Sequence, residues 1–583
     1  MTLPLTTVVS SPSPLTEVST TAKKDAPGKT CEWKYCLAGV AILGVVYLLL
    51  QNGKWVSGPD TAFYISVARN LALGRGFIFN GAVVGRIPPL WPAVMALGMK
   101  VSTSYWLLNL LPMFFLLGGA AVWYWVLRRL TSPRGALLAV VLSGILFFTY
   151  TSSIQLRTEG LFCLVFAPAV LVAMQIGEGK SLVWRLPALL ILCIGMVMVR
   201  WAGLAAWVVV GAAIMSGNRP VSVGRWVALL ASFVVVVGTF GLTRFILGRL
   251  PPPPRTWVME SGKKGPKIPD EDTEGTVKMQ SLMTPRGLRS TFLSMANSGK
   301  WMSSLMWMPM YMGVTHGMVG IATNIIGWGL ILLCAVAAWR DGKLGQWIWV
   351  GAFLYCAAMV FRVRVTNPRY LVPVAPLLVL GVIRGLEYLK ARVTPWKRFW
   401  GFSLGMFVVS VMAVNGALWG IDVWINHSTD FYSRYRAGEM ERLIASADYM
   451  RERGVRDGEI AVNVFYVNLG RQRPNGEGLR TMILLTDHGV RGGPAGCTGE
   501  PNDVLLKWAA KFDVKYYLYR PPVSPWRALH FKLKRVQQIL TGKEDIPDNP
   551  SWVLYELSRR GAVKVELPQN MVEMGRVPGM TKQ

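Results

Sequence analysis

An acidic residue directly precedes a stretch with helical periodicity near the start of the chain. Asp60 is followed by Phe63, Tyr64, Val67 and Leu71, which recur at helical spacing with polar residues between them. A carboxylate within hydrogen-bond reach of a hydroxyl can remove its proton as the oxygen attacks carbon. Asp in this position is also a common helix N-cap, and one side chain can fill both roles. Asp60 is therefore a candidate general base.

A set of arginines lies at ends of apolar blocks that the charge pattern places outside the cytoplasm. These are Arg86, Arg200, Arg362, Arg364 and Arg369. Their positions run against the usual bias of basic residues toward the cytoplasm, so they call for a partner. A planar guanidinium can hold a lipid phosphate through two hydrogen bonds and stabilise the negative charge of a leaving group. Salt bridges to the acidic stretch at 270–274 are the competing explanation.

Other familiar catalytic patterns do not occur in the sequence. The four histidines are far apart, and neither HExxH nor CxxC is found, which argues against a zinc site. A GxSxG nucleophile elbow is absent as well. Helix-turn-helix, zinc-finger and aromatic RNA-binding patterns are also missing, so nucleic acid is not an expected partner.

The composition indicates a membrane protein. Of 583 residues, 52% are hydrophobic and only 16% are charged. The apolar residues come in blocks of roughly 16 to 25, about the length that crosses a bilayer at 1.5 Å per residue. The net charge of +30 is attributed to cytoplasmic loops that meet anionic lipid.

Eleven apolar blocks are predicted to span the membrane. They lie near 36–51, 105–127, 136–152, 160–176, 184–199, 201–215, 225–247, 316–339, 346–362, 370–389 and 400–424. With the N-terminus inside, the basic residues of the short loops fall consistently on the cytoplasmic side. Any chemistry in the longer loops would then take place outside the cytoplasm, where a donor must be delivered by the membrane.

The predicted organisation has three parts. Residues 1–34 form a disordered cytoplasmic tail, and 35–425 form the transmembrane domain, with external loops 52–104 and 248–315. Residues 426–583 have the composition of an extracytoplasmic α/β domain, assigned to acceptor binding or to covering the active site.

Local patterns predict several elements outside the membrane. The helix after Asp60 is expected to lie on the membrane surface, and 88–99 should form a second interfacial helix. In the C-terminal domain, helices are expected at 437–453, 502–511 and 552–560. Strands are expected at 459–467, 514–519 and 562–566.

Several motifs, in their order along residues 36–425, resemble those of the GT-C membrane glycosyltransferases. They are Gly58-Pro59-Asp60-Thr61-Ala62-Phe63-Tyr64, Arg86-Ile87-Pro88-Pro89, Arg157-Thr158-Glu159-Gly160, Arg200-Trp201-Ala202-Gly203 and Arg369-Tyr370-Leu371. Within that superfamily the chain looks most like the aminoarabinose transferases and protein O-mannosyltransferases. The expected fold class is an α-helical polytopic membrane protein with about eleven transmembrane helices and a small C-terminal α/β domain.

The resemblance implies a role for each matching residue. Asp60 would be the catalytic base, and Glu159 a second carboxylate from across the cavity; its alternative is an interfacial residue paired with Arg157. Tyr64 and Arg157 would bind substrate. The donor phosphate would be bound by Tyr370 and the arginines named above: Arg86, Arg200, Arg362, Arg364 and Arg369.

The implied reaction moves a sugar from a polyprenyl-phosphate donor to an acceptor hydroxyl. The acceptor would be an envelope glycan, lipid or protein, and the enzyme a monomer in a bacterial inner membrane. No cofactor is expected beyond the lipid-linked donor, which is itself a substrate.

Two positions depart from the pattern of the relatives. Many relatives carry two adjacent acidic residues where this chain has Asp60 and Thr61, so a carboxylate-bound divalent metal is not supported. Relatives often place Lys directly before the Pro-Pro pair, whereas Ile87 separates Arg86 from it.

A transporter or lipid flippase is the alternative function, although the paired interrupted halves typical of such proteins are not visible in the sequence. A non-catalytic scaffold is the third possibility.

Overall fold

Helices make up most of the structure, a computed structural model that describes residues 32–580 with gaps. The gaps are 57–59, 81, 85–86, 218–219, 250–297, 308–317, 363–367, 394–395, 428–438, 463–464, 469–470, 475, 489, 493–499, 520–552, 559–560, 568–576 and 579. The predicted tail up to residue 31 and the acidic stretch at 270–274 therefore lie outside the described residues.

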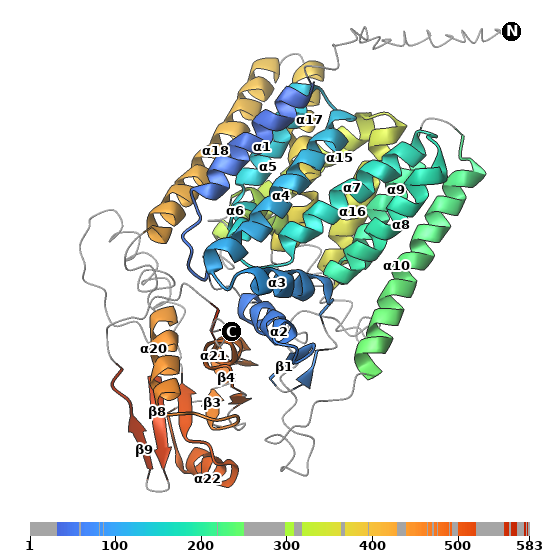
Figure 1. The fold of residues 1–583 in the computed structure, drawn as a ribbon. Coiled ribbons are helices and arrows are strands. Elements are labelled where there is room, and N and C mark those ends of the chain that lie inside the picture. Colours follow the sequence, from blue (N-terminus) through green and yellow to red (C-terminus); the bar gives the residue numbers. More distant parts are fainter. Residues whose placement is uncertain are drawn as a thin grey trace, which may run out of the picture.

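The described helices of the bundle run side by side, with the sheet domain at one end (Figure 1). Their bounds are α1 Glu32–Leu48, α4 Tyr105–Arg128, α5 Pro133–Ile145, α6 Phe147–Tyr150, α7 Glu159–Gly177, α8 Leu182–Val199, α9 Gly203–Met215, α10 Val223–Arg249, α15 Met318–Arg340, α16 Lys343–Arg362, α17 Ala375–Arg392 and α18 Lys397–Asn426. Serine side chains cap the N-termini of three of them. Ser104, Ser132 and Ser181 accept hydrogen bonds from backbone N–H groups in the first turns of α4, α5 and α8.

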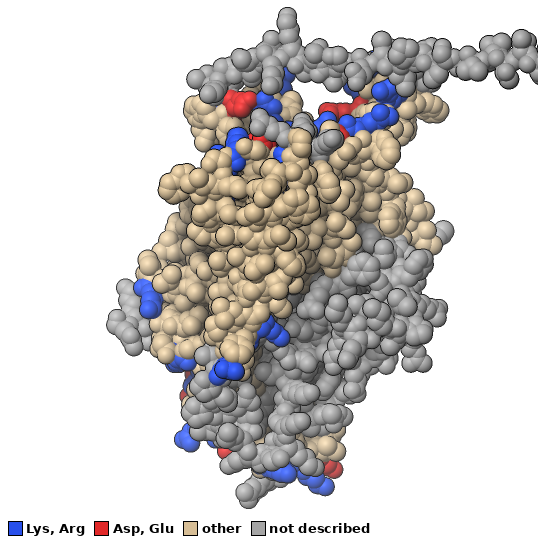
Figure 2. Space-filling view, turned by 90° about the vertical axis from the view of Figure 1, so that its right-hand side faces the viewer, with Lys and Arg blue, Asp and Glu red and all other residues tan. Residues whose placement is uncertain are grey.

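Seven of the described helical segments are long and apolar enough to cross a membrane, and an eighth crossing results if a bent pair counts as one span. Each of the eleven predicted blocks contains a helix, but α1, α9 and α16 do not meet that measure. Large apolar side chains such as Leu107, Ile191 and Phe402 point out of the bundle. Figure 2 shows a broad uncharged belt across the described part of one face, with charged residues along its upper rim. The chain is a multi-pass membrane protein, while the count of eleven spans stays a prediction.

The basic turns between helices gather at one end of the bundle. Arg128 at the end of α4 pairs with Glu32 at the start of α1, with a nitrogen to oxygen distance of 2.8 Å. Its neighbour Arg129 pairs with Glu178, directly after α7. Since α7 begins at Glu159, that residue lies at the opposite end of the bundle from this basic rim.

The span predicted at 136–152 is broken. Helix α5 ends at Ile145, and the segment Phe147–Ser153 leaves it at an angle of 69°. The second part is polar: the hydroxyls of Thr151 and Ser152 each donate to a carbonyl one turn back, at 2.7 Å. Such bonds compete with the helical ladder and bend the chain. This short segment leads directly to the start of α7.

Two short helices lie across the end of the bundle that faces the C-terminal sheet (Figure 1). Helix α2 (Thr61–Ala72) packs against α3 (Leu90–Val101), and a small hairpin of β1 (Ile78–Phe79) and β2 (Ala82–Val83) lies between them in sequence. The predicted helix after Asp60 is thus confirmed as α2. Its polar residues Ser66 and Arg69 are fully buried, however, because α21 of the C-terminal domain covers them.

The predicted external loop 248–315 has one described helix, α13 (Ser298–Met306). Its Trp301, Met302 and Leu305 are buried in the core, and it packs against α15 and the 3-10 helix η4 (Pro368–Val374). This packing explains why the stretch is rich in Met and Trp.

The C-terminal domain contains a five-stranded sheet of order β6-β3-β7-β8-β9. Its described elements are α20 Glu439–Glu452, β3 Ile460–Val462, β4 Phe465–Asn468, β5 Arg471–Pro474, α21 Gly476–Thr486, β6 Val490–Gly492, α22 Asp503–Phe512, β7 Tyr516–Tyr519, β8 Val553–Ser558 and β9 Gly561–Lys564. Strand β3 pairs in parallel with β6 and β7, and β8 runs antiparallel between β7 and β9.

Two expectations for this domain were wrong. The helix predicted at 552–560 is strand β8, in which buried Tyr555 and Leu557 alternate with exposed Glu556 and Ser558. That alternation has the period of a strand. The strand predicted at 459–467 is divided between β3 and β4, which belong to different sheets. Helix α21 has no counterpart among the predicted elements.

Candidate active site

Two ion pairs join four elements at the site end of the bundle. Asp60, directly before α2, contacts Arg369 in η4, with 2.8 Å between Oδ2 and Nη2. Glu159, the first residue of α7, contacts Arg200, the residue after α8, with 3.1 Å between Oε1 and Nη1. Residues from distant parts of the sequence thus meet because their helices end at the same level.

Tyr370 lies between the two arginines. The Cζ atoms of Arg200 and Arg369 lie 4.7 Å and 5.2 Å from the centre of its ring. Nη2 of Arg369 is also 3.4 Å from the Tyr370 hydroxyl, to which it donates a hydrogen bond. Tyr355 in α16 fixes the backbone of Tyr370 by donating to its carbonyl at 2.8 Å. Both guanidinium groups are therefore within cation–π distance of the Tyr370 ring.

Close backbone packing sets the position of Arg200. This residue is extended, with φ −156° and ψ 134°, between the end of α8 and the start of α9. A Cβ on Gly203 would lie 2.5 Å from the carbonyl oxygen of Met196, so only glycine allows this tight turn. Gly160 has the same role beside Glu159, because a Cβ there would lie 2.7 Å from the carbonyl oxygen of Pro112.

Replacing Gly203 with Ala is expected to destabilise the protein by about 1–3 kcal/mol, because α8 and α9 must separate. Gly238 in α10 is the matched control, since no atom of the described residues lies within 4 Å of a Cβ placed there. Thermal unfolding in detergent should occur at a lower temperature for Gly203→Ala than for Gly238→Ala, which should be neutral or slightly stabilising. Equal unfolding temperatures would show that the turn tolerates a side chain.

The cluster carries an excess of positive charge. Arg157, Arg200 and Arg369 all lie close to Glu159, and Asp60 is the other nearby carboxylate. Glu159 is 2% exposed, whereas the Asp60 side chain is 27% exposed. Among the described residues, Oε2 of Glu159 has no hydrogen-bond partner. Three arginines facing two carboxylates favour an anionic ligand.

Tyr64 lies beside this cluster on the first turn of α2. Burial raises the pKa of its phenol above the ordinary value, and the negative charge of Asp60 raises it further. Tyr64 therefore stays protonated near neutral pH and can donate a hydrogen bond.

The structure brings together most of the residues that the sequence singled out: Asp60, Tyr64, Arg157, Glu159, Arg200, Arg369 and Tyr370. Asp60 holds the N-cap position of α2, yet its side chain makes no capping hydrogen bond. Glu159 forms an ion pair with Arg200, and Arg157 also lies close to its carboxylate. Arg86 and Arg364 lie outside the described residues, and Arg362 is described only as the last residue of α16.

Tyr355 was missed in the sequence because it lies in the middle of an apolar block, where a lone Tyr carries no signal. The polar run of Thr149, Thr151, Ser152 and Ser153 was also missed, although four hydroxyl residues at the end of an apolar block could have indicated a break.

In the described part of the chain, no group of three or more His, Cys, Asp or Glu side chains could hold a metal ion.

No family model and no curated protein sequence matches the chain. Among solved structures, it is similar to ArnT from Cupriavidus metallidurans bound to undecaprenyl phosphate, with 13% identity and a TM-score of 0.48 over 89% of this chain and 97% of that one. It is also similar to the archaeal oligosaccharyltransferase AglB from Archaeoglobus fulgidus, solved with an inhibitory peptide and a dolichol-phosphate. There the identity is 10% and the TM-score 0.47, over 84% and 70% of the two chains. At this level of similarity, neither structure decides what the site does.

Proposed function

We propose that the chain is a membrane glycosyltransferase that moves a sugar from a polyprenyl-phosphate donor to an acceptor hydroxyl. The observation that carries the proposal is the cluster of Arg200, Arg369, Asp60 and Glu159 at one end of a membrane-spanning bundle. It combines cations for a phosphate with a partly exposed carboxylate that can take a proton.

In the proposed reaction, one bond forms as another breaks. The acceptor oxygen attacks the anomeric carbon while its proton passes to Asp60. The bond from that carbon to the phosphate oxygen breaks, and its electron pair leaves with the polyprenyl phosphate. Arg369 and Arg200 stabilise the growing negative charge on this leaving group, with Tyr370 holding their planes in place.

The remaining residues have supporting roles in the proposed reaction. Asp60 is the more exposed carboxylate and meets the acceptor, whereas buried Glu159 holds Arg200 in place. The remaining oxygen of Glu159 can accept a hydrogen bond from a sugar hydroxyl. Tyr64 and Arg157 contact the substrate, and Arg86, Arg362 and Arg364 add to the phosphate site.

The site is proposed to face outward from a bacterial inner membrane. The basic rim formed by Arg128 and Arg129 lies at the other end of α7 from Glu159, and basic loops favour the cytoplasm. Free nucleotide sugars are scarce outside, which favours a donor carried by lipid.

The proposal is tested in two steps. First, mass spectrometry compares the envelope lipids, glycans and proteins of a strain lacking the chain with those of the complemented strain, to identify the missing glycoside. Second, membrane vesicles that contain the protein receive the corresponding labelled polyprenyl-phosphate sugar, and we expect label on the acceptor. Label that crosses the bilayer while still attached to the lipid would instead support a flippase.

A further inference from the structure

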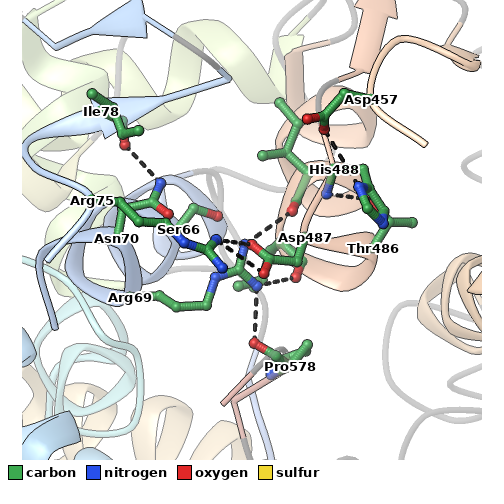
Figure 3. A network of polar contacts seen from close by, with 12 residues as sticks. Ser66, Arg69, Asn70, Arg75, Ile78, Asp457, Thr486, Asp487, His488 and Pro578 are labelled. Atoms are coloured by element: carbon green, nitrogen blue, oxygen red, sulfur yellow. Dashed lines mark hydrogen bonds and ion pairs between the residues drawn. The ribbon is translucent and has the colours of Figure 1, made fainter. Parts of the chain in front are cut away.

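A second Arg–Asp pair lies at the other end of α2. Arg69 is 1% exposed, and its Nη2 is 2.6 Å from Oδ1 of Asp487, the residue that follows α21. Figure 3 shows Arg69 reaching from α2 toward Asp487, with Pro578 of the C-terminal tail on a further side of the guanidinium. This contact joins the transmembrane part of the chain to the soluble domain.

The guanidinium of Arg69 also caps α21. Nη1 donates to the carbonyl oxygens of Leu484 at 2.8 Å and Pro578 at 2.9 Å, and Nη2 donates to that of Ile483 at 3.3 Å. The last carbonyls of a helix have no partner within it and attract a cation. Only the planar fork of Arg reaches several acceptors at once, so Lys cannot replace it.

The backbone of Asp487 restricts which residue can replace it. Asp487 has φ +59°, a left-handed conformation that Asn and Asp tolerate better than most residues but that glycine adopts most easily. Asparagine can keep this backbone and nearly the same shape while losing the charge. Asp487→Asn is therefore a variant that removes the ion pair and keeps the fold.

Helix α2 is thus pinned at both ends to different domains. Asp60 at its start pairs with Arg369 of the transmembrane domain, and Arg69, about 13 Å further along the axis, pairs with Asp487 of the soluble domain. Reciprocal hydrogen bonds between Asn80 and the backbone of Val490 add to the second attachment. A rotation or shift of α2 would therefore move Asp60 relative to Arg369.

We propose that Arg69 and Asp487 are positioning residues through which the C-terminal domain holds Asp60 at the catalytic geometry. This inference rests on the proposed function, because it assigns the soluble domain a part in the same reaction. Arg69 touches no reacting atom; it acts through the orientation of α2.

The test uses the full-length protein with Arg69→Lys and Asp487→Asn. Hydrogen–deuterium exchange over residues 61–72 should become faster in both variants. With the labelled donor, kcat for transfer should fall about 10- to 100-fold, since small misplacements of a catalytic group have effects of this size. The KM for the donor should stay within about twofold, because Arg200 and Arg369 are unchanged.

Arg75→Ala is the matched control. Arg75 contacts the same carboxylate, with 3.1 Å between Nη1 and Oδ2, but its side chain is 47% exposed, and exposed pairs contribute little. Its exchange and kcat should match those of the unmodified protein. Unchanged exchange over α2 in Arg69→Lys would overturn this inference but not the proposed function. So would unchanged kcat in both Arg69→Lys and Asp487→Asn while Asp60→Asn is inactive. Full activity of Asp60→Asn would instead remove the proposed function beneath it.

Discussion

Replacing Asp60 with Asn is expected to lower kcat for sugar transfer by about 10²–10⁴-fold, the usual contribution of a general base. Asparagine keeps the shape of the side chain and can still accept a hydrogen bond from Arg369, but it cannot take the acceptor proton. The KM for the donor should not rise, because the phosphate loses a competing negative charge beside Arg369. Single-turnover transfer in vesicles measures the effect directly.

The control for this variant is Asp448→Asn in α20. Asp448 also pairs with an arginine, Arg451, but both residues lie on α20, away from the site. Its kcat should be unchanged. If Asp60→Asn transferred sugar within threefold of the unmodified rate at equal expression, Asp60 would not be the base.

Replacing Arg369 with Ala is expected to reduce kcat/KM by about 10²–10³-fold, the usual cost of losing one group that stabilises transition-state charge. Two effects combine here, because the leaving phosphate loses a cation and Asp60 loses the partner that orients it. Arg369→Lys should recover part of the loss, since the charge returns without the fork that contacts both Asp60 and Tyr370.

Binding of polyprenyl phosphate without a sugar separates these two effects. The affinity should fall for Arg369→Ala and should be unchanged or higher for Asp60→Asn, which removes a negative charge beside Arg369. Arg340→Ala is a suitable control, because Arg340 also stacks on a tyrosine, with its Cζ 4.6 Å from the Tyr388 ring, but ends a different helix. Equal lipid-phosphate affinity in the Arg369 and Arg340 variants would contradict a phosphate site at Arg369.

The helices of the bundle could be predicted well from the sequence because a bilayer leaves the backbone few choices. Within lipid, every backbone group must be paired inside its own segment, so an apolar block becomes a helix. The break at Ile145 escaped this reasoning because Phe147 and Phe148 keep the block apolar while the hydroxyls that bend it follow later.

The members of the site could be predicted, but their pairing could not. Asp60, Glu159, Arg200 and Arg369 stand out as charges at the ends of apolar segments. Which carboxylate meets which arginine depends on how α2, α7, α8 and η4 pack, and this packing has no signal in the local sequence.

The polar side of α2 was misread for a related reason. In the sequence, Arg69 looks like a solvent-facing residue of an amphipathic helix. The carbonyl groups that it contacts come more than 400 residues later in the chain, so no neighbouring residue points to them. No local pattern indicates that α21 packs against this side of α2. Long-range contacts of this kind are invisible to periodicity.

The sequence distance between Arg69 and Pro578, 509 residues, sets a timetable for biogenesis. At the usual pace of translation, roughly 25–100 s pass between the synthesis of these two residues. During that interval the ribosome delivers α4 to α18 to the bilayer while Arg69 still lacks its contacts with Asp487 and Pro578. On the proposed scheme, a nascent polypeptide that has already inserted α1 to α18 therefore transfers sugar about 10- to 100-fold more slowly, and full activity begins only when these two residues fold onto Arg69.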